Sequence, residues 1–204
     1  MLSRKERQEY LKDLGFYDGP INGEWNDEVK VAVDKLQKKY FPKKYWDGGK
    51  YTEERTDRLL VNAWRVWKYA PHFSLTEFKC GCGGKHCSGY PAYISVQLLK
   101  NLETLRKKCG NRPIQITCGM RCKKYNDSLP GSVPKSLHRF GRAVDLYVSG
   151  TCDTEKGRQL VMSYWKQMPL YNYTYCYLPK SKVAAYNSCP NMGKAVHVDV
   201  SQDK

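Results

Sequence analysis

Three side chains in the C-terminal half of the chain, His138, Asp145 and His197, have the chemistry of metal ligands. Only four histidines occur in the 204 residues, so their positions are informative. In residues 195–200 three valines alternate with His197 and a second acid, so a strand would place the valines on one face and the imidazole on the other. Residues 143–148 alternate in the same way and set Asp145 opposite three apolar side chains.

Two imidazoles and one carboxylate suit Zn²⁺ and leave a fourth position for water. If the two strands are neighbours, Asp145 and His197 converge, and the short link 139–142, which contains Gly141, can fold back so that His138 reaches the same ion. Zn²⁺ lowers the pKa of bound water toward ~7 and polarises a carbonyl, and peptide hydrolysis needs both effects. On spacing alone, hydrogen-bonded polar side chains explain the pattern at least as well.

The elements around these side chains predict an α+β domain. Apolar residues at helical spacing indicate two helices, and short β-rich runs between Gly and Pro turns indicate strands. We expect the helices to pack against a mainly antiparallel sheet. The predicted helices cover residues 95–109 and 154–167, and the predicted strands cover 114–117, 143–148, 173–178 and 195–200.

The first part of the chain has a different character, that of three helices separated by Gly turns. The first helix ends before Gly15, the second follows Asn26 as its N-cap, and the third begins at Thr52. This change of character predicts a helical domain over 1–68 and an α+β domain over 69–204. The third helix is expected to carry Leu59, Leu60, Ala63 and Trp67 on one stripe.

Residues 11–26, followed by a helix from Val29 to Tyr40, resemble the peptidoglycan-binding domain found beside many bacterial and phage wall hydrolases. The specific part is the turn Leu-Gly-Phe-Tyr-Asp-Gly before that helix. The second half of the usual repeat is reduced to Trp-Asp-Gly-Gly at 46–49. The resemblance implies that the domain binds glycan or stem peptide, and the alternative is a helical bundle without a ligand.

Four motifs resemble those of the M15 peptidases, the D-Ala-D-Ala carboxypeptidase family, and in particular its M15_3 subfamily. Residues 136–145 and 197–199 follow the signature Ser-x-His-x-x-Gly-x-Ala-x-Asp and His-x-Asp. Residues 116–126 are similar to the family's Ile-Thr-Ser-Gly-Tyr-Arg segment, and 73–78 to its usual opening. The resemblance implies the α+β zinc fold shared by Hedgehog and D-Ala-D-Ala peptidases.

By position, the resemblance assigns His138, Asp145 and His197 to Zn²⁺ and assigns Arg121 and Ser136 to the substrate. A guanidinium can hold a peptide carboxylate with two hydrogen bonds, or it can stabilise the oxyanion that forms as the carbonyl is attacked. The alternative for Arg121 is a surface ion pair.

The general base is where the sequence departs from the family. Many relatives carry an acid three residues before the last zinc ligand, and this chain has Lys194 there, which cannot accept a proton in its cationic form. Asp199 shares a strand face with His197 and is expected to act as the general base in place of the missing acid. Asp199 could equally orient the imidazole of His197, and the two roles remain open.

A cysteine-rich loop predicts a second metal site. Cys80, Cys82 and Cys87, together with Cys122 or His86, could bind a structural zinc, although Cys-x-Cys is tighter than the usual spacing. Free thiols or an occasional disulfide are the alternatives. The nine cysteines cannot all pair within one chain, and we expect reduced thiols at synthesis.

The net charge of +15 implies an acidic partner. The basic residues are spread along the chain without a nucleic-acid module, so an anionic cell wall is favoured over nucleic acid. No apolar run approaches the ~18 residues that cross a bilayer, so no membrane partner is expected. The charged N-terminus lacks a signal-peptide pattern, which predicts synthesis in the cytoplasm.

These observations predict a monomeric, endolysin-like wall hydrolase that is released during phage or prophage lysis. It would cut either as a D-Ala-D-Ala carboxypeptidase or as an L-alanyl-D-glutamate endopeptidase. The alternative from another class is a non-catalytic, zinc-containing wall-binding protein, which the lysine at position 194 keeps open.

Overall fold

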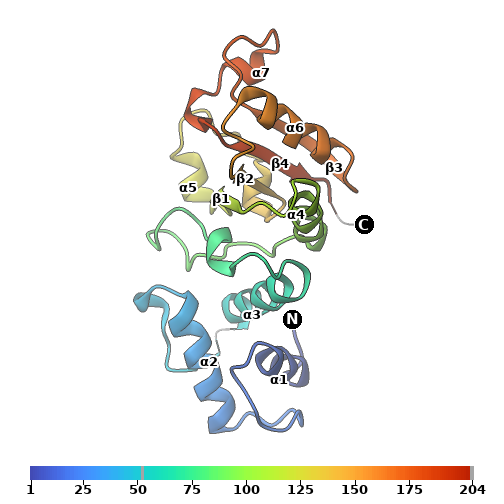
Figure 1. Cartoon of the computed structure of the whole chain (residues 1–204). Coiled ribbons are helices and arrows are strands. Elements are labelled where there is room, and N and C mark those ends of the chain that lie inside the picture. Colours follow the sequence, from blue (N-terminus) through green and yellow to red (C-terminus); the bar gives the residue numbers. More distant parts are fainter. Residues whose placement is uncertain (52, 203–204) are drawn as a thin grey trace.

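A computed structural model describes residues 1–51 and 53–202 (Figure 1). Three N-terminal helices lie at one end of the molecule, and a four-stranded sheet with its helices lies at the other (Figure 1). Among the described residues, no helix is long and apolar enough to cross a membrane. The longer helices are α1 (Arg4–Asp13), α2 (Asp27–Tyr40), α3 (Glu53–Tyr69), α4 (Val96–Lys108) and α6 (Glu155–Lys166), and the shorter ones are α5 (Lys123–Asp127) and α7 (Ala184–Asn187).

The N-terminal helices follow the predicted pattern. Asn26 caps α2 by accepting a hydrogen bond from the backbone N–H of Val29 at 3.1 Å, as expected. The predicted start of the third helix, Thr52, lies outside the described residues. Leu59, Leu60 and Ala63 are buried, whereas Trp67 is 51% exposed near the C-terminal end of α3. At about 100° per residue, seven positions leave Trp67 about 20° from Leu60, so it lies on the predicted stripe although it is not covered there.

Helix α3 joins the two ends of the molecule. The Asn62 amide donates to the carbonyl of Ala92 at 2.8 Å and accepts from the backbone N–H of Ile94 at 2.8 Å. Arg65 also donates to the Ile94 carbonyl at 2.7 Å. One cluster of buried apolar side chains runs from the N-terminal helices to the sheet. The division into domains 1–68 and 69–204 remains a prediction.

The sheet is entirely antiparallel, with strand order β1-β2-β4-β3, which confirms the α+β class and the predicted type of sheet. Its third strand begins and ends two residues before the predicted limits. Helix α6 packs on β3 and β4, and α4 also contacts β4. The strands are β1 (Ile114–Cys118), β2 (Ala143–Val148), β3 (Tyr171–Cys176) and β4 (Val196–Val200).

The two inner strands bury their apolar side chains on the helix-covered face of the sheet, as the alternation predicts. On that face Trp165 of α6 is fully buried, and its indole N–H donates to the backbone carbonyl of Asp199 at 3.0 Å. The polar side chains of β2 and β4 are thereby directed to the opposite face. The apolar set consists of Val144, Leu146, Val148, Val196, Val198 and Val200.

Candidate metal and active site

The antiparallel pairing of β2 and β4 brings Asp145 directly opposite His197. The carboxylate Oδ1 of Asp145 lies 2.8 Å from His197 Nδ1 and 3.4 Å from His138 Nε2. The two imidazole nitrogens lie 3.3 Å apart. The structure therefore brings together all three residues that the sequence predicts as zinc ligands, and we call them the metal triad.

His138 reaches the sheet because the chain reverses just before β2. It lies in the short 3₁₀ helix η3 (Leu137–Phe140), which ends at Gly141 in the left-handed conformation with φ of 65°. A Cβ atom at Gly141 would lie 2.2 Å from the carbonyl oxygen of Tyr93, so a larger residue does not fit. The predicted glycine link thus folds back toward Asp145.

Each of the two imidazoles has a hydrogen-bond partner outside the metal triad, and this partner determines which ring nitrogen faces the triad. His138 Nδ1 lies 2.8 Å from the carbonyl oxygen of Gly119, which can only accept, so Nε2 is left as the ligand atom. His197 Nε2 lies 3.1 Å from Asp199 Oδ2, which leaves Nδ1 to face the other two residues of the metal triad. Histidine ligands of metals ordinarily have such partners on their other nitrogen.

The spacing of the three ligand atoms fits one tetrahedral ion. Zinc bonds of about 2.0–2.1 Å at tetrahedral angles place neighbouring ligand atoms about 3.3 Å apart. Two of the three separations in the metal triad, 3.3 and 3.4 Å, have this length, and the third is 2.8 Å. His138, Asp145 and His197 are 2%, 5% and 7% exposed, so only a small part of each residue reaches solvent.

The charges within the metal triad are strongly coupled. Burial alone would lower the pKa of His138, but its hydrogen bond with Asp145 and the nearby Cys118 raise that pKa to about 9. Burial opposes ionisation of Asp145, yet hydrogen bonds from both histidines hold its pKa below the usual range. A metal ion can bind His138 only when its ligand nitrogen is unprotonated, so metal binding at these three groups would release protons.

Arg121 contacts the metal triad from one side. Its Nη2 donates to Asp145 Oδ2 at 3.3 Å, and its Nε donates to the sulfur of Cys118 at 3.3 Å. The thiol of Cys118 lies within 4.8 Å of the ligand atoms of His138 and Asp145. Sequence reasoning did not single out Cys118. The available signal was its position, because it replaces the serine of the Ile-Thr-Ser-Gly segment.

A cleft of about 410 Å³ is lined by His138 and His197 of the metal triad, whereas Asp145 lines a second pocket. The cleft is lined by residues of the segment 131–138, including the buried Ser136, and by Tyr173 and Tyr175 of β3. The ring of Tyr175 stacks on the imidazole of His197, with 4.7 Å between ring centroids. Burial raises the pKa of Tyr175 to about 12, so this phenol remains protonated at neutral pH. Arg121 also lines the cleft.

Asp199 is held at the floor of this cleft. Besides the contact with His197, its Oδ1 accepts hydrogen bonds from the Asn172 amide at 3.0 Å and from the backbone N–H of Tyr173 at 2.6 Å. Lys194 does not line this cleft but lines the second pocket, together with Asp145 and Cys118, and its ammonium pairs with Asp153 at 2.7 Å. Among the described residues that line the cleft, Asp199 is the sole carboxylate.

The four cysteines predicted as a second metal site also come together. The sulfur atoms of Cys80, Cys82, Cys87 and Cys122 all lie within 4.8 Å of one another, and we call them the cysteine cluster. His86, the alternative fourth ligand, is exposed. A hydrogen bond from the Cys87 thiol lowers the pKa of Cys80 to about 5, against the effect of burial. All nine cysteines are described, and none forms a disulfide in the structure.

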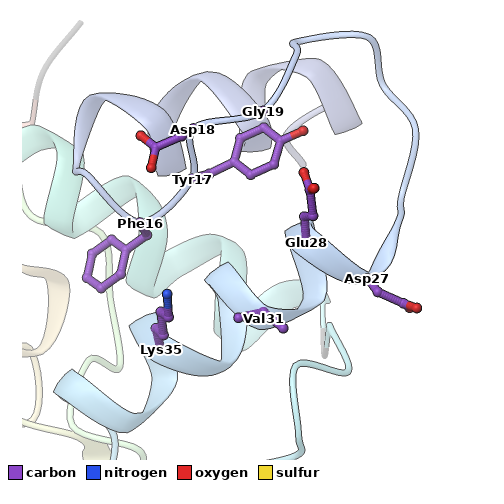
Figure 2. Close-up of a pocket in the computed structure, with 8 residues that line it drawn as sticks. All are labelled: Phe16, Tyr17, Asp18, Gly19, Asp27, Glu28, Val31 and Lys35. Atoms are coloured by element: carbon purple, nitrogen blue, oxygen red, sulfur yellow. The ribbon is translucent and has the colours of Figure 1, made fainter.

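A separate pocket lies in the N-terminal part of the molecule, between the turn 16–19 and helix α2 (Figure 2). Figure 2 shows Tyr17 and Glu28 on facing sides of this pocket, with Lys35 nearer to Phe16. The turn belongs to the segment that resembles a wall-binding domain. A Cβ atom at Gly19 would lie 2.4 Å from the Tyr17 hydroxyl, so the glycine lets the turn close over that ring.

The sequence matches the family model described as Peptidase M15 over residues 71–175. This match covers a little more than half of the 204 residues and includes His138, Asp145 and Arg121. It ends before His197, which the pairing of β2 with β4 brings back to Asp145. No match is found among curated proteins.

Proposed function

Because this chain belongs to the M15 peptidase family, we propose that it hydrolyses a peptide bond in the stem or crosslink peptides of peptidoglycan, with Zn²⁺ held by the metal triad. The observation that carries the proposal is the convergence of two imidazoles and one carboxylate at 2.8–3.4 Å beside an open cleft. Zn²⁺ bound there would supply Lewis acidity, which activates water and polarises a carbonyl at neutral pH.

Arg121 is the residue that we assign to the substrate. One edge of its guanidinium contacts Asp145 and Cys118, which fixes the plane of the group at the rim of the cleft. A guanidinium held in this way can bind a stem-peptide carboxylate or the oxyanion that develops during hydrolysis. The buried Ser136 also lines the cleft and is the second residue that we assign to substrate binding.

Asp199 has the contacts of a residue that positions His197. Its Oδ2 faces His197 Nε2, and its Oδ1 already accepts two hydrogen bonds from β3. These contacts support the orienting role over that of a general base, because a base must also reach the proton of the attacking water. We propose that Asp199 keeps the proton of His197 on Nε2, so that Nδ1 remains a metal ligand.

We further propose that residues 1–68 hold the enzyme on the wall as a peptidoglycan-binding domain. The pocket between the turn 16–19 and α2 is the candidate binding site (Figure 2). The net charge of +15 favours association with an anionic wall, and attachment raises the local concentration of substrate. The setting we propose is lysis by a phage or prophage, with the protein acting as a monomer.

Hydrolysis of purified peptidoglycan tests the activity. The native protein and His138→Ala are incubated with walls of several chemistries, with and without chelator, and the fragments are identified by mass spectrometry. We expect fragments from the native protein alone, and we expect the chelator to abolish them. Release of terminal D-Ala identifies a carboxypeptidase, whereas cleavage between L-Ala and D-Glu identifies an endopeptidase.

The second candidate function is a non-catalytic wall-binding protein that retains zinc. It is favoured by Lys194, which stands where many relatives carry an acid and pairs with Asp153 outside the cleft. A zinc-loaded native protein that bound walls and released no fragment from any of them would support this function and would contradict the peptidase proposal.

A further inference from the structure

We propose that the cysteine cluster binds a second zinc ion, which is structural and joins the cysteine-rich loop to the segment that carries Arg121. The cluster is made of three thiols from one loop and a fourth from a position 35 residues further along the chain. Their sulfur atoms all lie within 4.8 Å of one another, and those of Cys80, Cys82 and Cys122 belong to buried residues.

The distances fit a metal better than a disulfide. Zinc–sulfur bonds of about 2.3 Å at tetrahedral angles place the sulfur atoms about 3.8 Å apart, whereas a disulfide needs about 2.05 Å. The sulfur atoms of Cys82 and Cys87 lie 3.6 Å apart. The backbone N–H of Cys122 donates to the Cys80 sulfur at 3.2 Å, a contact that strengthens when the acceptor is a thiolate.

The loop is built to direct several thiols toward one point. The backbone N–H of Cys80 donates to the carbonyl of Gly89 at 2.7 Å, which closes the loop at its base. Lys85 N–H donates to the Cys82 carbonyl at 3.0 Å, which forms a tight turn inside the loop. Apart from Tyr125, the described apolar side chains packed in this cluster are cysteines themselves. A loop with so small a core gains its stability from a metal.

The position of the cluster gives the ion a structural role. Cys122 directly follows Arg121, and two residues earlier the N–H of Met120 donates to the carbonyl of Phe78 at 3.0 Å. On its other side the loop meets the N-terminal part, where the Tyr45 hydroxyl lies 3.5 Å from the Gly84 carbonyl. Four thiolates leave no position for water, so this ion would take no part in hydrolysis.

Metal analysis of the full-length protein tests the site. The native protein is purified without chelator, beside a His138→Ala/His197→Ala variant, a Cys87→Ser/Cys122→Ser variant and the matched control Cys189→Ser. Cys189 is a half-buried cysteine outside the cluster. We expect two zinc ions per chain in the native protein and the control, and one in each of the other variants.

Cobalt substitution provides a readout that does not depend on the cysteine variants folding. The histidine variant, which keeps all four thiols of the cysteine cluster, should show the near-ultraviolet absorption of thiolate-to-cobalt charge transfer when it is loaded with Co²⁺. Absence of that absorption in the histidine variant, or a disulfide within the cluster in freshly purified native protein, would overturn the proposal. Neither result bears on the peptidase proposal. That proposal fails if the walls stay intact although zinc occupies the metal triad.

Discussion

Replacing Asp199 by asparagine separates the two roles that this carboxylate could have. In the native structure the carboxylate accepts hydrogen bonds from three donors, namely His197 Nε2, the Asn172 amide and the backbone N–H of Tyr173. An asparagine of the same shape has one acceptor oxygen and one NH₂ group. Whichever way the amide is turned, its NH₂ group faces the N–H of either His197 or Tyr173 in a buried site.

The size of the effect follows from which contact is lost. If the NH₂ group faces His197, the imidazole proton is driven from Nε2 to Nδ1, the nitrogen that faces Asp145 at 2.8 Å. Loss of such an outer partner typically weakens metal binding about 10- to 100-fold, or about 1.4–2.7 kcal/mol. If the amide turns the other way, the unsatisfied N–H of Tyr173 destabilises the fold by about 1–3 kcal/mol.

Two measurements on Asp199→Asn decide the matter. Zinc affinity is measured by competition with a chromophoric chelator, and wall hydrolysis is measured with zinc in excess. We expect weakened zinc binding, with most of the hydrolysis restored when the site is saturated. Asp153→Asn is the matched control, because that exposed carboxylate pairs with Lys194 outside the cleft, and it should leave both quantities unchanged.

The opposite pattern would refute the reasoning. A general base contributes about 10²- to 10⁴-fold to the rate. If Asp199→Asn bound zinc as tightly as the native protein and still lost hydrolysis by this factor at saturating zinc, Asp199 would be the base. If neither quantity changed, both roles would be excluded.

Three further substitutions test the site and its support. Arg121→Lys keeps the positive charge but loses the guanidinium group that contacts Asp145. The kcat/KM on wall fragments should therefore fall about 10²-fold at unchanged zinc content. An unchanged kcat/KM would mean that Arg121 takes no part in substrate binding or catalysis. Gly141→Ala should lower the free energy of unfolding in urea by at least about 2 kcal/mol, because its φ is 65° and the new Cβ meets the Tyr93 carbonyl. Leu146→Ala should cost about 2–5 kcal/mol in the same assay, since the side chain is fully buried, and a smaller loss would mean that the core closes over the cavity.

The faces of β2 and β4 could be predicted because a strand alternates its side chains residue by residue, which is a local property. The sequence therefore indicated that Asp145 and His197 lie opposite the apolar face. Their pairing across the sheet is a long-range property, and it was conditional on the two strands being neighbours. The burial of both side chains depends in addition on the segment 131–138 and on β3, which no local pattern places over them.

The errors have local physical causes. The run that contains β3 alternates tyrosines with other residues from Tyr171 to Tyr177, and Pro169 and Pro179 bracket a stretch longer than the strand. No Gly or Pro inside the stretch marks where the pairing begins or ends, so the limits of β3 were misplaced by two residues. The short helices α5 and α7 have too few residues for a helical period to appear. Cys118 was missed because a single thiol on a strand carries no spacing signal, and its neighbours come from η3 and β2.

The five residues 118–122, from the last residue of β1 onward, connect the metal triad, Arg121 and the cysteine cluster. The carbonyl of Gly119 fixes the tautomer of His138, the guanidinium of Arg121 holds Asp145, and the last residue belongs to the cysteine cluster. A Cβ atom at Gly119 would lie 2.5 Å from the backbone carbonyl carbon of Phe78, so this segment packs closely against Phe78 and has little room to shift. A substitution in the cysteine cluster should therefore move the carbonyl of Gly119 and the guanidinium of Arg121, both of which contact the metal triad. It should change the zinc affinity of the metal triad although none of its three residues is substituted.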